Sequence, residues 1–366
     1  MGKIYTALGL MSGTSMDGVD ASIIQTDGKS KYKAILDKYF KYPENIYNDL
    51  TILRDKVKTP TDLKKHQKKI KSVEKSITIF HAESVDKILK KTRQNVDFIG
   101  FHGQTIFHNA AEKITKQLGD GKLLSKLTKK KVIYNFRQND LINGGDGAPL
   151  APIFHKMLQK KFNIKPLSFF NIGGILNRTT MGDDEELSAA DCGPGMCLID
   201  KWIRTNSKKK YDNNGAIAKS GKVNKKILEK YYNYFITSNL GKKSYDTNDF
   251  SISIVKNLSL KDGAATLTLY TANFFNTHFQ KNESLQIKEK IILCGGGRKN
   301  KFLVSTIKSF NKDVKLIDDY GIDGDFVESQ AFGYLAIRSY LGLPISFPKT
   351  TGCKKPTTGG VIVKNY

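Results

Sequence analysis

The segment from Gly9 to Asp20 carries the residue types that bind phosphate groups and a divalent cation. It reads GLMSGTSMDGVD, so its glycines let the backbone approach a ligand while its hydroxyl side chains offer further donors. Asp17 and Asp20 are candidate Mg²⁺ ligands, directly or through water. The alternative is a hairpin turn in which Asp17-Gly18 serves only the backbone. The candidate phosphate-binding residues are Gly13, Thr14, Ser15, Met16, Asp17, Gly18, Val19 and Asp20.

A second glycine-rich turn, Gly295-Gly296-Gly297, follows a short apolar run and precedes a lysine-rich helix start. The chain contains neither the GxxxxGK[ST] pattern of the P-loop nor the GxGxxG pattern of dinucleotide-binding folds. A nucleotide would therefore have to bind by another design, for which glycine-rich turns in both halves of the chain are suited.

Other polar residues lie where a strand ends or a helix begins. His102, Gln104 and Thr105 follow an apolar strand, at the end where ligands gather in open α/β sheets, although a structural histidine is as common there. Asp191 enters a Gly-Pro-Gly loop, in which an Asx-turn or a helix N-cap is at least as frequent a role as catalysis. Glu328 begins the last helix, where the helix dipole favours an acidic residue even without a ligand.

Strands and helices alternate along the chain in two halves. In the first half we expect a strand, turn, strand, strand opening, one long amphipathic helix that starts with Pro60, and two further strands. These elements are predicted at residues 4–10, 19–25, 32–42, 60–88, 96–101 and 132–136.

The second half repeats the strand, turn, strand logic of the first. Strands are predicted at 167–172, 175–179 and 290–294, and helices at 196–204, 224–234, 262–279 and 328–341. This alternation predicts an α/β fold with two domains that face each other over a cleft. We place an N-terminal domain at residues 1–140 and a C-terminal domain at 141–366, with the C-terminal tail able to complete the first.

The composition is typical of an ordered globular protein in a reducing compartment. At 366 residues the chain is too long for one hydrophobic core, and its 39% of hydrophobic residues argues against disorder. Its four cysteines form no CxxC pair and are too few for a disulfide framework, and no apolar run approaches the length of a membrane span. We therefore expect a cytoplasmic protein with no membrane partner.

The formal charge of +25 makes nucleic acid an alternative partner, because basic proteins bind by neutralising phosphates. The lysines are scattered, however, and no aromatic platform of an RNA-binding fold lies among them. Solvated helix faces and loops explain most of these lysines, and their field would also attract small anionic ligands. We expect no nucleic-acid partner, and a basic RNA-binding protein stays the alternative.

Seven segments, in order and over nearly the whole chain, resemble motifs of the anhydro-N-acetylmuramic acid kinase family. One glycine-rich turn would be weak support, whereas seven matches in sequence are not expected by chance. The segments are Gly9–Asp20 (GLMSGTSxDGVD), Gly100–His108 (GxHGQTxxH), Gly144–Pro152 (GGxGAPLxP), Asn171–Asn177 (NIGGIAN), Asp191–Gly195 (DTGPG), Ile292–Asn300 (CGGGxxN) and the helix that begins at Glu328 (EAxAFAxLA).

The resemblance implies an actin-like kinase with two RNase H-like α/β domains and an ATP cleft between them. Enzymes of this family open the 1,6-anhydro ring of 1,6-anhydro-N-acetylmuramic acid with water and phosphorylate O6 with ATP and Mg²⁺. The product is N-acetylmuramic acid 6-phosphate. These enzymes act in the cytoplasmic recycling of cell-wall sugars and are typically homodimers.

The resemblance also implies a role for each candidate residue. Asp191 corresponds to the base that takes a proton from the attacking water. The implied phosphate and Mg²⁺ site is Gly13–Asp20, with Asp17 and Asp20 as metal ligands. The implied turn on the adenosine side is Gly295–Gly297. The implied sugar contacts are His102, Gln104, Thr105 and Glu328.

The chain also departs from the family pattern. Asn135 stands where the family has Asp before Phe-Arg, Asp146 replaces Gln, and Cys192 and Met196 replace Thr and Asn beside the base. The stretch Lys243–Asn248 keeps only the Lys-Ser of a KSTGRE-like segment, which predicts a changed substrate or domain contact there. A protein that binds ATP as a conformational switch, without sugar phosphorylation, therefore stays an alternative function.

Overall fold

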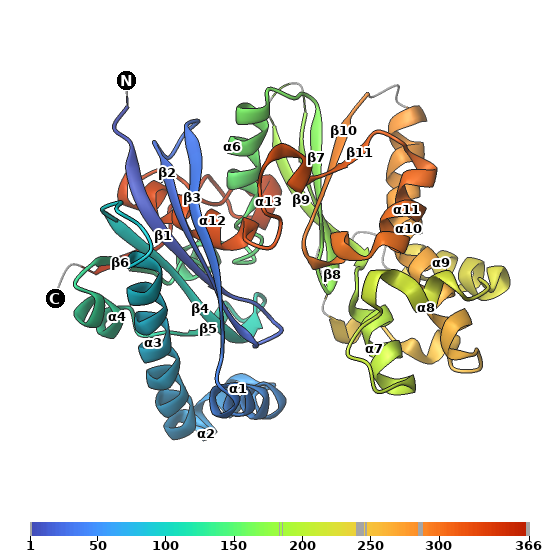
Figure 1. Cartoon of the computed structure of the whole chain (residues 1–366), viewed down its shortest axis with the longest axis horizontal. Coiled ribbons are helices and arrows are strands. Elements are labelled where there is room, and N and C mark those ends of the chain that lie inside the picture. The colour runs from blue at the N-terminus through green and yellow to red at the C-terminus, as the bar shows by residue number, and fades with distance from the viewer. Residues whose placement is uncertain are drawn as a thin grey trace. The chain divides into compact units, whose positions relative to one another are not determined.

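The chain forms two compact units, of which the second is inserted into the first. Unit 1 comprises Met1–Asn163 and Phe326–Tyr366, and unit 2 comprises Ile164–Asp325. The computed structural model describes residues 2–182, 184, 186–238, 245, 247–284 and 288–363. Figure 1 follows the chain from the blue strands of unit 1 through unit 2 and back to the red elements of unit 1.

Unit 1 is built on a mixed sheet. Its strands are β1 (Tyr5–Ser12), β2 (Gly18–Thr26), β3 (Tyr32–Lys41), β4 (Phe98–Asn109), β5 (Ile114–Leu118), β6 (Lys131–Tyr134) and β12 (Val361–Val363). The strand order is β12-β6-β4-β1-β2-β3, and β5 pairs with β4. β1, β2 and β3 are antiparallel neighbours, whereas β1, β4 and β6 run parallel.

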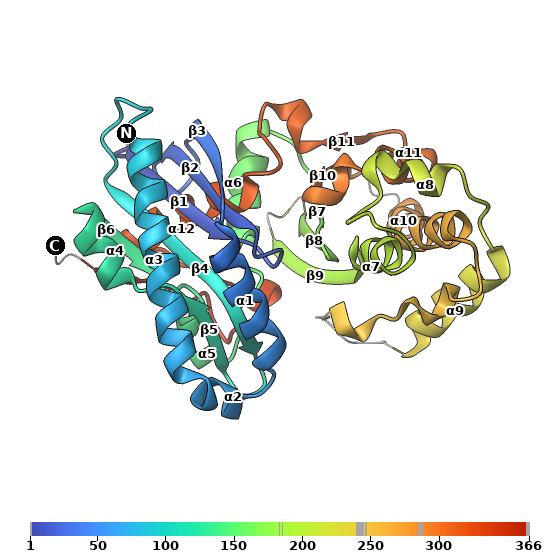
Figure 2. The same ribbon diagram turned by 60° about the horizontal axis from the view of Figure 1, so that its bottom comes forward.

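Helices cover both faces of this sheet. They are α1 (Glu44–Lys56), α2 (Pro60–Lys65), α3 (Gln67–Leu89), α4 (Gly121–Thr128), α5 (Gln138–Ile142), α6 (Pro152–Phe162), α12 (Val327–Tyr340) and α13 (Pro348–Thr351). α12 lies against β1, β2 and β4 on one face, and α1, α3 and α4 lie on the other (Figures 1 and 2). Because helices cover both faces, β1 is buried almost throughout and reads as a continuous apolar run.

Two glycines let α12 approach the sheet backbone to backbone. A Cβ atom on Gly9 of β1 would lie 1.9 Å from the carbonyl oxygen of Ser329, and one on Gly100 of β4 would lie 2.2 Å from that of Phe332. A side chain at either position would therefore push α12 away from the sheet. The contact fixes the depth of the helix whose first turn carries Glu328.

Unit 2 repeats the same plan with a five-stranded sheet. Its strands are β7 (Leu167–Ile172), β8 (Ile175–Met181), β9 (Leu187–Pro194), β10 (Lys290–Cys294) and β11 (Val314–Leu316), in the order β11-β10-β7-β8-β9. Its helices are α7 (Cys197–Asn206), α8 (Ala216–Lys219), α9 (Lys225–Ser238), α10 (Leu260–Ser284) and α11 (Lys301–Phe310).

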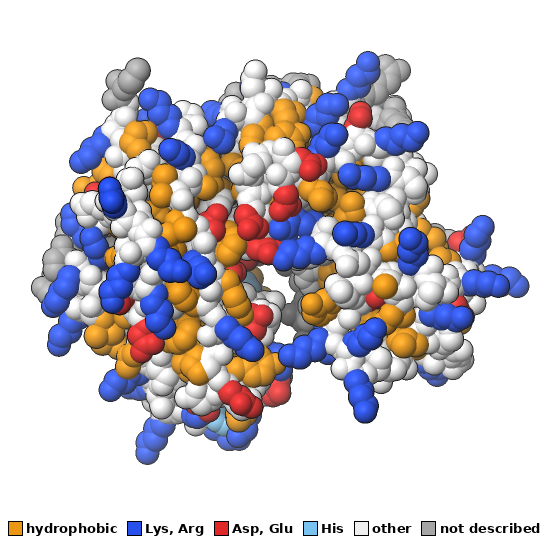
Figure 3. Space-filling view, viewed as in Figure 1, with side chains coloured by type: hydrophobic (Ala, Val, Ile, Leu, Met, Phe, Trp, Pro, Cys, Tyr) orange, Lys and Arg blue, Asp and Glu red, His pale blue; other side chains and the backbone are white. Residues whose placement is uncertain are grey.

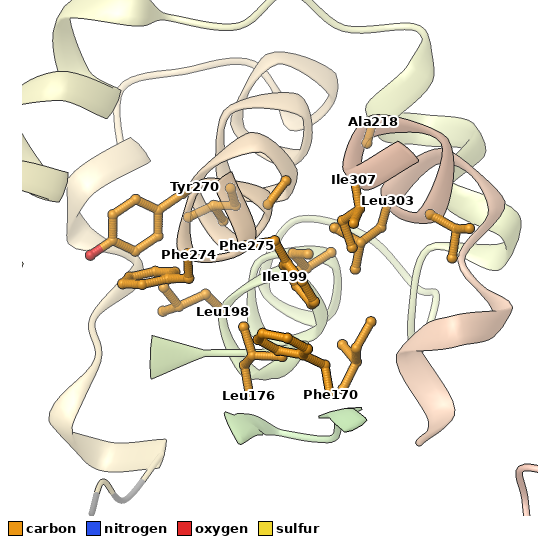
Figure 4. Close-up of a cluster of buried hydrophobic side chains, with 14 of the residues drawn as sticks. Phe170, Leu176, Leu198, Ile199, Ala218, Tyr270, Phe274, Phe275, Leu303 and Ile307 are labelled. Carbon is orange, nitrogen blue, oxygen red and sulfur yellow. The ribbon is translucent and has the colours of Figure 1, made fainter. Parts of the chain in front are cut away.

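The core of unit 2 lies between its sheet and helices α7, α10 and α11 (Figure 4). Phe170 and Leu176 of the sheet face Leu198, Phe275 and other apolar side chains of these helices. Each of these four side chains is at most 2% exposed, so the apolar periodicity of the sequence is explained by core packing.

Both sheets therefore share one topology. Three antiparallel strands follow each other in chain order, and two later strands join in parallel on the other side of the first one. This is the RNase H-like arrangement, present once in each unit. The predicted α/β, actin-like fold class is confirmed, whereas an ATP cleft between the units stays a prediction.

The units divide the chain elsewhere than at residue 140. α6 belongs to unit 1 because Phe154 packs against Tyr32 and Tyr334, with ring centroids 5.3 and 5.7 Å apart. The chain returns to unit 1 at Phe326 because α12 completes its core. The predicted completion of the first domain by the C-terminal tail agrees with this division, and the predicted extent of 141–366 does not.

Some element predictions were wrong in detail. The single helix at 60–88 is divided at His66, which ends α2 and precedes α3. α1 was not predicted, although its buried residues Ile46, Leu50 and Leu53 recur at helical spacing. Asp191 lies in strand β9 and not in a loop. Within Lys243–Asn248, Lys243, Ser244 and Asp246 lie outside the described residues.

The close approach of α12 makes the stability of unit 1 sensitive to one methyl group. We expect Gly100→Ala to lower the melting temperature by roughly 6–10 °C, since overpacking of about 3 kcal/mol must be absorbed by backbone shifts. Gly2→Ala is the control, because the nearest atom to its Cβ is 3.9 Å away. Calorimetry checks both, and an unchanged melting temperature for Gly100→Ala would contradict this packing.

Candidate active site

The phosphate-binding candidate of unit 1 is the turn between β1 and β2. The turn is closed by a hydrogen bond of 3.1 Å from the N–H of Met16 to the carbonyl of Gly13, and Met16 adopts a positive φ of 58°. The side chains of Thr14 and Ser15 are exposed, whereas those of Met16 and Val19 are buried. The turn thus has a fixed backbone and hydroxyl groups open to a ligand.

Buried side chains hold this turn from below. At the end of β1 the Ser12 hydroxyl lies 2.8 Å from the Tyr42 hydroxyl and 3.3 Å from Nε2 of His81. Gln104 lies beside Ser12 in the parallel pairing of β1 with β4, and its amide donates to the Gly13 carbonyl at 2.9 Å. Gln104, predicted to contact sugar, is therefore placed under the phosphate turn.

The two candidate metal ligands lie close to one tyrosine. Asp17 is exposed and its Oδ1 accepts from the Ser15 hydroxyl at 2.5 Å, while Asp20 is half-buried and pairs with Tyr39 across the sheet. Burial and the charges of both aspartates raise the pKa of Tyr39 to about 12. The negative potential and oxygen donors suit a hard divalent cation. Among the described residues no group of three His, Cys, Asp or Glu side chains forms a metal site by itself, so water and phosphate would have to supply further ligands.

His102 is fixed in one tautomer by its neighbours. Its Nδ1 lies 2.8 Å from the Gly103 carbonyl, to which it donates, and its Nε2 lies 2.9 Å from Nη2 of Arg137, from which it accepts. Burial and the guanidinium of Arg137 hold the pKa of His102 well below its usual range. His102 is therefore neutral, and it shares its surroundings with a half-buried cation, Arg137, that the sequence analysis did not single out.

A pocket of about 350 Å³ opens beside His102 in unit 1. Polar side chains from β4, β5 and β6 line it, and among them Gln117 donates to the Thr105 hydroxyl at 3.2 Å. Glu328 lies in the first turn of α12 with an exposed side chain. The four predicted sugar contacts thus occupy the carboxyl end of β4 and the start of α12.

Asp191 of unit 2 stands at the end of a row of polar residues. Asn171, Asn177 and Asp191 are direct cross-strand neighbours on β7, β8 and β9, so their side chains point to the same face. The backbone N–H of Tyr245 donates to Oδ2 of Asp191 at 2.8 Å. Burial raises the pKa of Asp191 to about 6, although this hydrogen bond opposes the shift. The neighbouring Cys192 is no nucleophile at neutral pH, because burial raises the pKa of its thiol to about 11.

The glycine-rich turn of unit 2 follows β10, which lies beside β7 and its Asn171. Gly295 adopts a φ of 78°, and a Cβ there would lie 2.2 Å from Oδ1 of Asn171. A Cβ on Gly297 would lie 2.3 Å from Cγ2 of Ile172, while one on Gly296 would meet nothing within 4 Å. Two of the three glycines are thus required by packing, and Gly296 leaves open space at the turn.

Arg298 anchors this turn, and the sequence analysis missed it. Its guanidinium, 4% exposed, donates to both carboxylate oxygens of Asp318 at 2.7 and 3.0 Å and to Asp325 at 2.7 Å. It also donates to the Gly295 carbonyl at 3.2 Å. These partners raise the pKa of Arg298 despite its burial. The signal in the sequence was a single arginine directly after three glycines, with acidic residues some twenty positions later.

Charge is spread over the surface. Figure 3 shows lysine and arginine side chains scattered over the visible faces of both units and not gathered on one patch. None of the described helices is long and apolar enough to cross a membrane.

Comparison with known proteins gives one consistent result. A sequence model described as "Anhydro-N-acetylmuramic acid kinase" matches residues 5–365. Curated proteins of that name include one from Pelagibacter ubique, 52% identical over 375 residues with all of both chains covered, and one from Agrobacterium fabrum, 37% identical over 384 residues with the same coverage. A third, from Zymomonas mobilis, is 39% identical over 97% of this chain and 99% of its own. A solved dehydratase activator from Clostridium difficile with bound ADPNP is 10% identical over 92% of this chain and 96% of its own, at a TM-score of 0.40, which is too low to add to the topology.

Ionised Asp191 should destabilise the folded chain, because burial raises its pKa from 3.8 to about 6. A raised carboxyl pKa means that stability is lost as the pH rises from about 4 through about 6. We expect Asp191→Asn to raise the free energy of unfolding by about 2 kcal/mol at pH 8 and by nothing at pH 4. Urea unfolding of both proteins across this range measures the difference. The same difference at pH 4 and pH 8 would show that ionisation is not its cause.

Removal of Arg298 should destabilise unit 2 because two carboxylates lose a shared partner. We expect Arg298→Met to lower the free energy of unfolding by about 2 kcal/mol, a value reduced for the partial exposure of both aspartates. Lys299→Met is the matched control: Lys299 also pairs with Asp325, yet its side chain is 62% exposed. Its effect should stay below about 0.5 kcal/mol. Equal effects of the two substitutions in urea unfolding would remove the special role of Arg298.

Proposed function

The chain belongs to the anhydro-N-acetylmuramic acid kinase family, and we propose that it opens the ring of 1,6-anhydro-N-acetylmuramic acid with water and phosphorylates O6 with ATP. The product is N-acetylmuramic acid 6-phosphate. We infer that the enzyme is a homodimer that acts in the cytoplasm, in the recycling of cell-wall sugars.

The observation that carries the proposal is the partial burial of Asp191 and its raised pKa. A half-buried carboxylate with a pKa of about 6 is mostly ionised at pH 7 to 8 and is still a better base than an exposed aspartate. Asp191 takes a proton from water while the water oxygen bonds to the anomeric carbon. The bond from that carbon to O6 breaks in the same process, so ring opening produces the nucleophile for the second step.

O6 then attacks the γ-phosphorus, and the bond between that phosphorus and the bridging oxygen breaks to release ADP. Such a transfer needs positioning and charge stabilisation more than covalent help. The backbone N–H groups and hydroxyls of Gly13–Asp20 would hold the phosphates, and Gly295–Gly297 would face the adenosine. Bound Mg²⁺ would neutralise phosphate charge, and the carboxylates of Asp17 and Asp20 are the residues suited to hold it.

We propose that the sugar binds at the carboxyl end of β4. His102, Thr105 and Glu328 would contact it there, with Gln104 acting at the boundary between sugar and phosphates. The neutral Nδ1–H tautomer of His102 and the half-buried guanidinium of Arg137 give this region fixed polar groups and a positive charge. A sugar that carries a carboxylate matches that charge.

Product analysis in ¹⁸O-water with ATP, Mg²⁺ and 1,6-anhydro-N-acetylmuramic acid tests the proposal. We expect the 6-phosphate with ¹⁸O at the anomeric carbon, because the new hydroxyl comes from water. Asp191→Asn should lower turnover by roughly a thousandfold or more, since the base is lost. Asp313→Asn removes an exposed carboxylate of the same unit and should keep wild-type turnover.

Two results would contradict the proposal. A 6-phosphate without ¹⁸O at the anomeric carbon would exclude ring opening by water. ATP binding without any turnover of this sugar would exclude the kinase function and favour an ATP-dependent switch.

A further inference from the structure

The segment that departs most from the family pattern touches the proposed base through its backbone. The N–H of Tyr245 donates to Oδ2 of Asp191 at 2.8 Å, although the two residues are 54 positions apart in the chain. No donor among the residues that the structure describes contacts Oδ1. The contact therefore engages one of the two carboxylate oxygens, Oδ2.

An aromatic cluster fixes the position of this N–H. The ring of Tyr245 packs against Phe235 of α9 and against Phe250, with centroids 5.3 and 5.7 Å apart. Phe235 in turn meets Phe274 of α10 edge to face at 5.1 Å. Buried aromatic contacts of this kind restrict the backbone that carries them. The donor is thus held by Phe235 of α9 and by Phe250, and Phe274 of α10 supports Phe235.

The same cluster also fixes the strand that carries Asp191. A Cβ on Gly193 of β9 would lie 2.8 Å from the ring of Phe274, so β9 passes directly against that ring two residues after Asp191. Phe274 therefore contacts the strand of the acceptor and, through Phe235, the segment of the donor. The distance between N–H and carboxylate is set by a shared aromatic support.

We propose that the backbone N–H of Tyr245 is a positioning group for the base: it holds Oδ2 of Asp191 and directs Oδ1 toward the attacking water. This inference rests on the proposed ring opening by water. The N–H belongs to the backbone and does not depend on which side chain the residue carries. The replacement of a KSTGRE-like segment therefore keeps this hydrogen-bond donor. What the side chain must supply is the aromatic contact, which Tyr245 provides.

Other titratable groups surround Asp191 and the N–H of Tyr245, and they stay the same when the N–H is removed. Cys192 lies on β9, and burial raises the pKa of its thiol against the smaller opposing effect of the charge of Arg178 on β8. Burial and the charge of Asp249 raise the pKa of Tyr245. Two further tyrosines are near, Tyr232 on α9 and Tyr270 on α10. Arg178 is itself bonded to His278. The hydrogen bond favours the ionised carboxylate, so its loss must raise the pKa of Asp191 while these neighbours stay the same.

The sharpest test replaces this one N–H by an oxygen atom. The α-hydroxy analogue of tyrosine, inserted at position 245 by nonsense suppression, gives a backbone ester, and tyrosine inserted by the same method is the matched control. In the ester protein we expect the apparent pKa of the acidic limb of the kcat/KM pH profile to rise by roughly half a pH unit to one pH unit. At pH 5 kcat/KM should fall roughly three- to tenfold, and at pH 8.5 it should stay within about twofold of the control.

A purely structural role for residue 245 gives a different result. It would lower kcat/KM by the same factor at every pH and leave the acidic limb in place, which would overturn the inference. NMR titration of ¹³C-carboxyl-labelled aspartate, with Asp191 assigned from Asp191→Asn, measures the same shift without turnover. An unchanged Asp191 pKa in the ester protein refutes the positioning role, whereas a shifted pKa in a protein that fails to open the sugar ring refutes only the proposed function.

Discussion

The pairing of the first strand of each unit with a strand from far along the chain is the constraint on which the candidate site depends. In unit 1, β1 runs parallel to β4 and brings Ser12 beside Gln104. In unit 2, β7 runs parallel to β10 and brings Asn171 beside Cys294, directly before the glycine-rich turn. Parallel neighbours end at the same edge of a sheet, so residues separated by about ninety or more positions share one surface.

Buried polar side chains near the turns form hydrogen bonds with specific partners, and these partners determine whether each side chain is charged or neutral. His102 can stay neutral because Arg137 donates to one ring nitrogen and a backbone carbonyl accepts from the other. Arg298 can stay charged because Asp318 and Asp325 face it. Asp191 differs from both, because a single backbone N–H is its only donor among the described residues. A carboxylate that is incompletely compensated is less stable as an anion and is therefore a better proton acceptor.

The sequence predicted the strands and glycine turns well, because short apolar runs bounded by glycine-rich turns are local patterns. β7 and β10 have the predicted bounds, and the repeat of the strand, turn, strand logic corresponds to the repeated topology. The placement of Gln104 under the phosphate turn could not be predicted, since it depends on the register between β1 and β4. Arg298 was missed for the same reason, since its guanidinium acts on aspartates distant in sequence. The stretch that contains Tyr245 was singled out as a departure from the family pattern, but its contact with Asp191 could not be predicted, because a backbone N–H carries no sequence signature. The domain boundary was misplaced because α6 is amphipathic in sequence whichever unit it joins.

The insertion of unit 2 into unit 1 has a consequence for synthesis on the ribosome. The sheet of unit 1 needs α12 against Gly9 and Gly100, and α12 is translated only after all of unit 2. Unit 2 is continuous, so it can fold as soon as Asp325 has left the exit tunnel. The N-terminal strands must meanwhile wait with one apolar face uncovered, which makes this interval the stage at which the nascent chain most needs a chaperone.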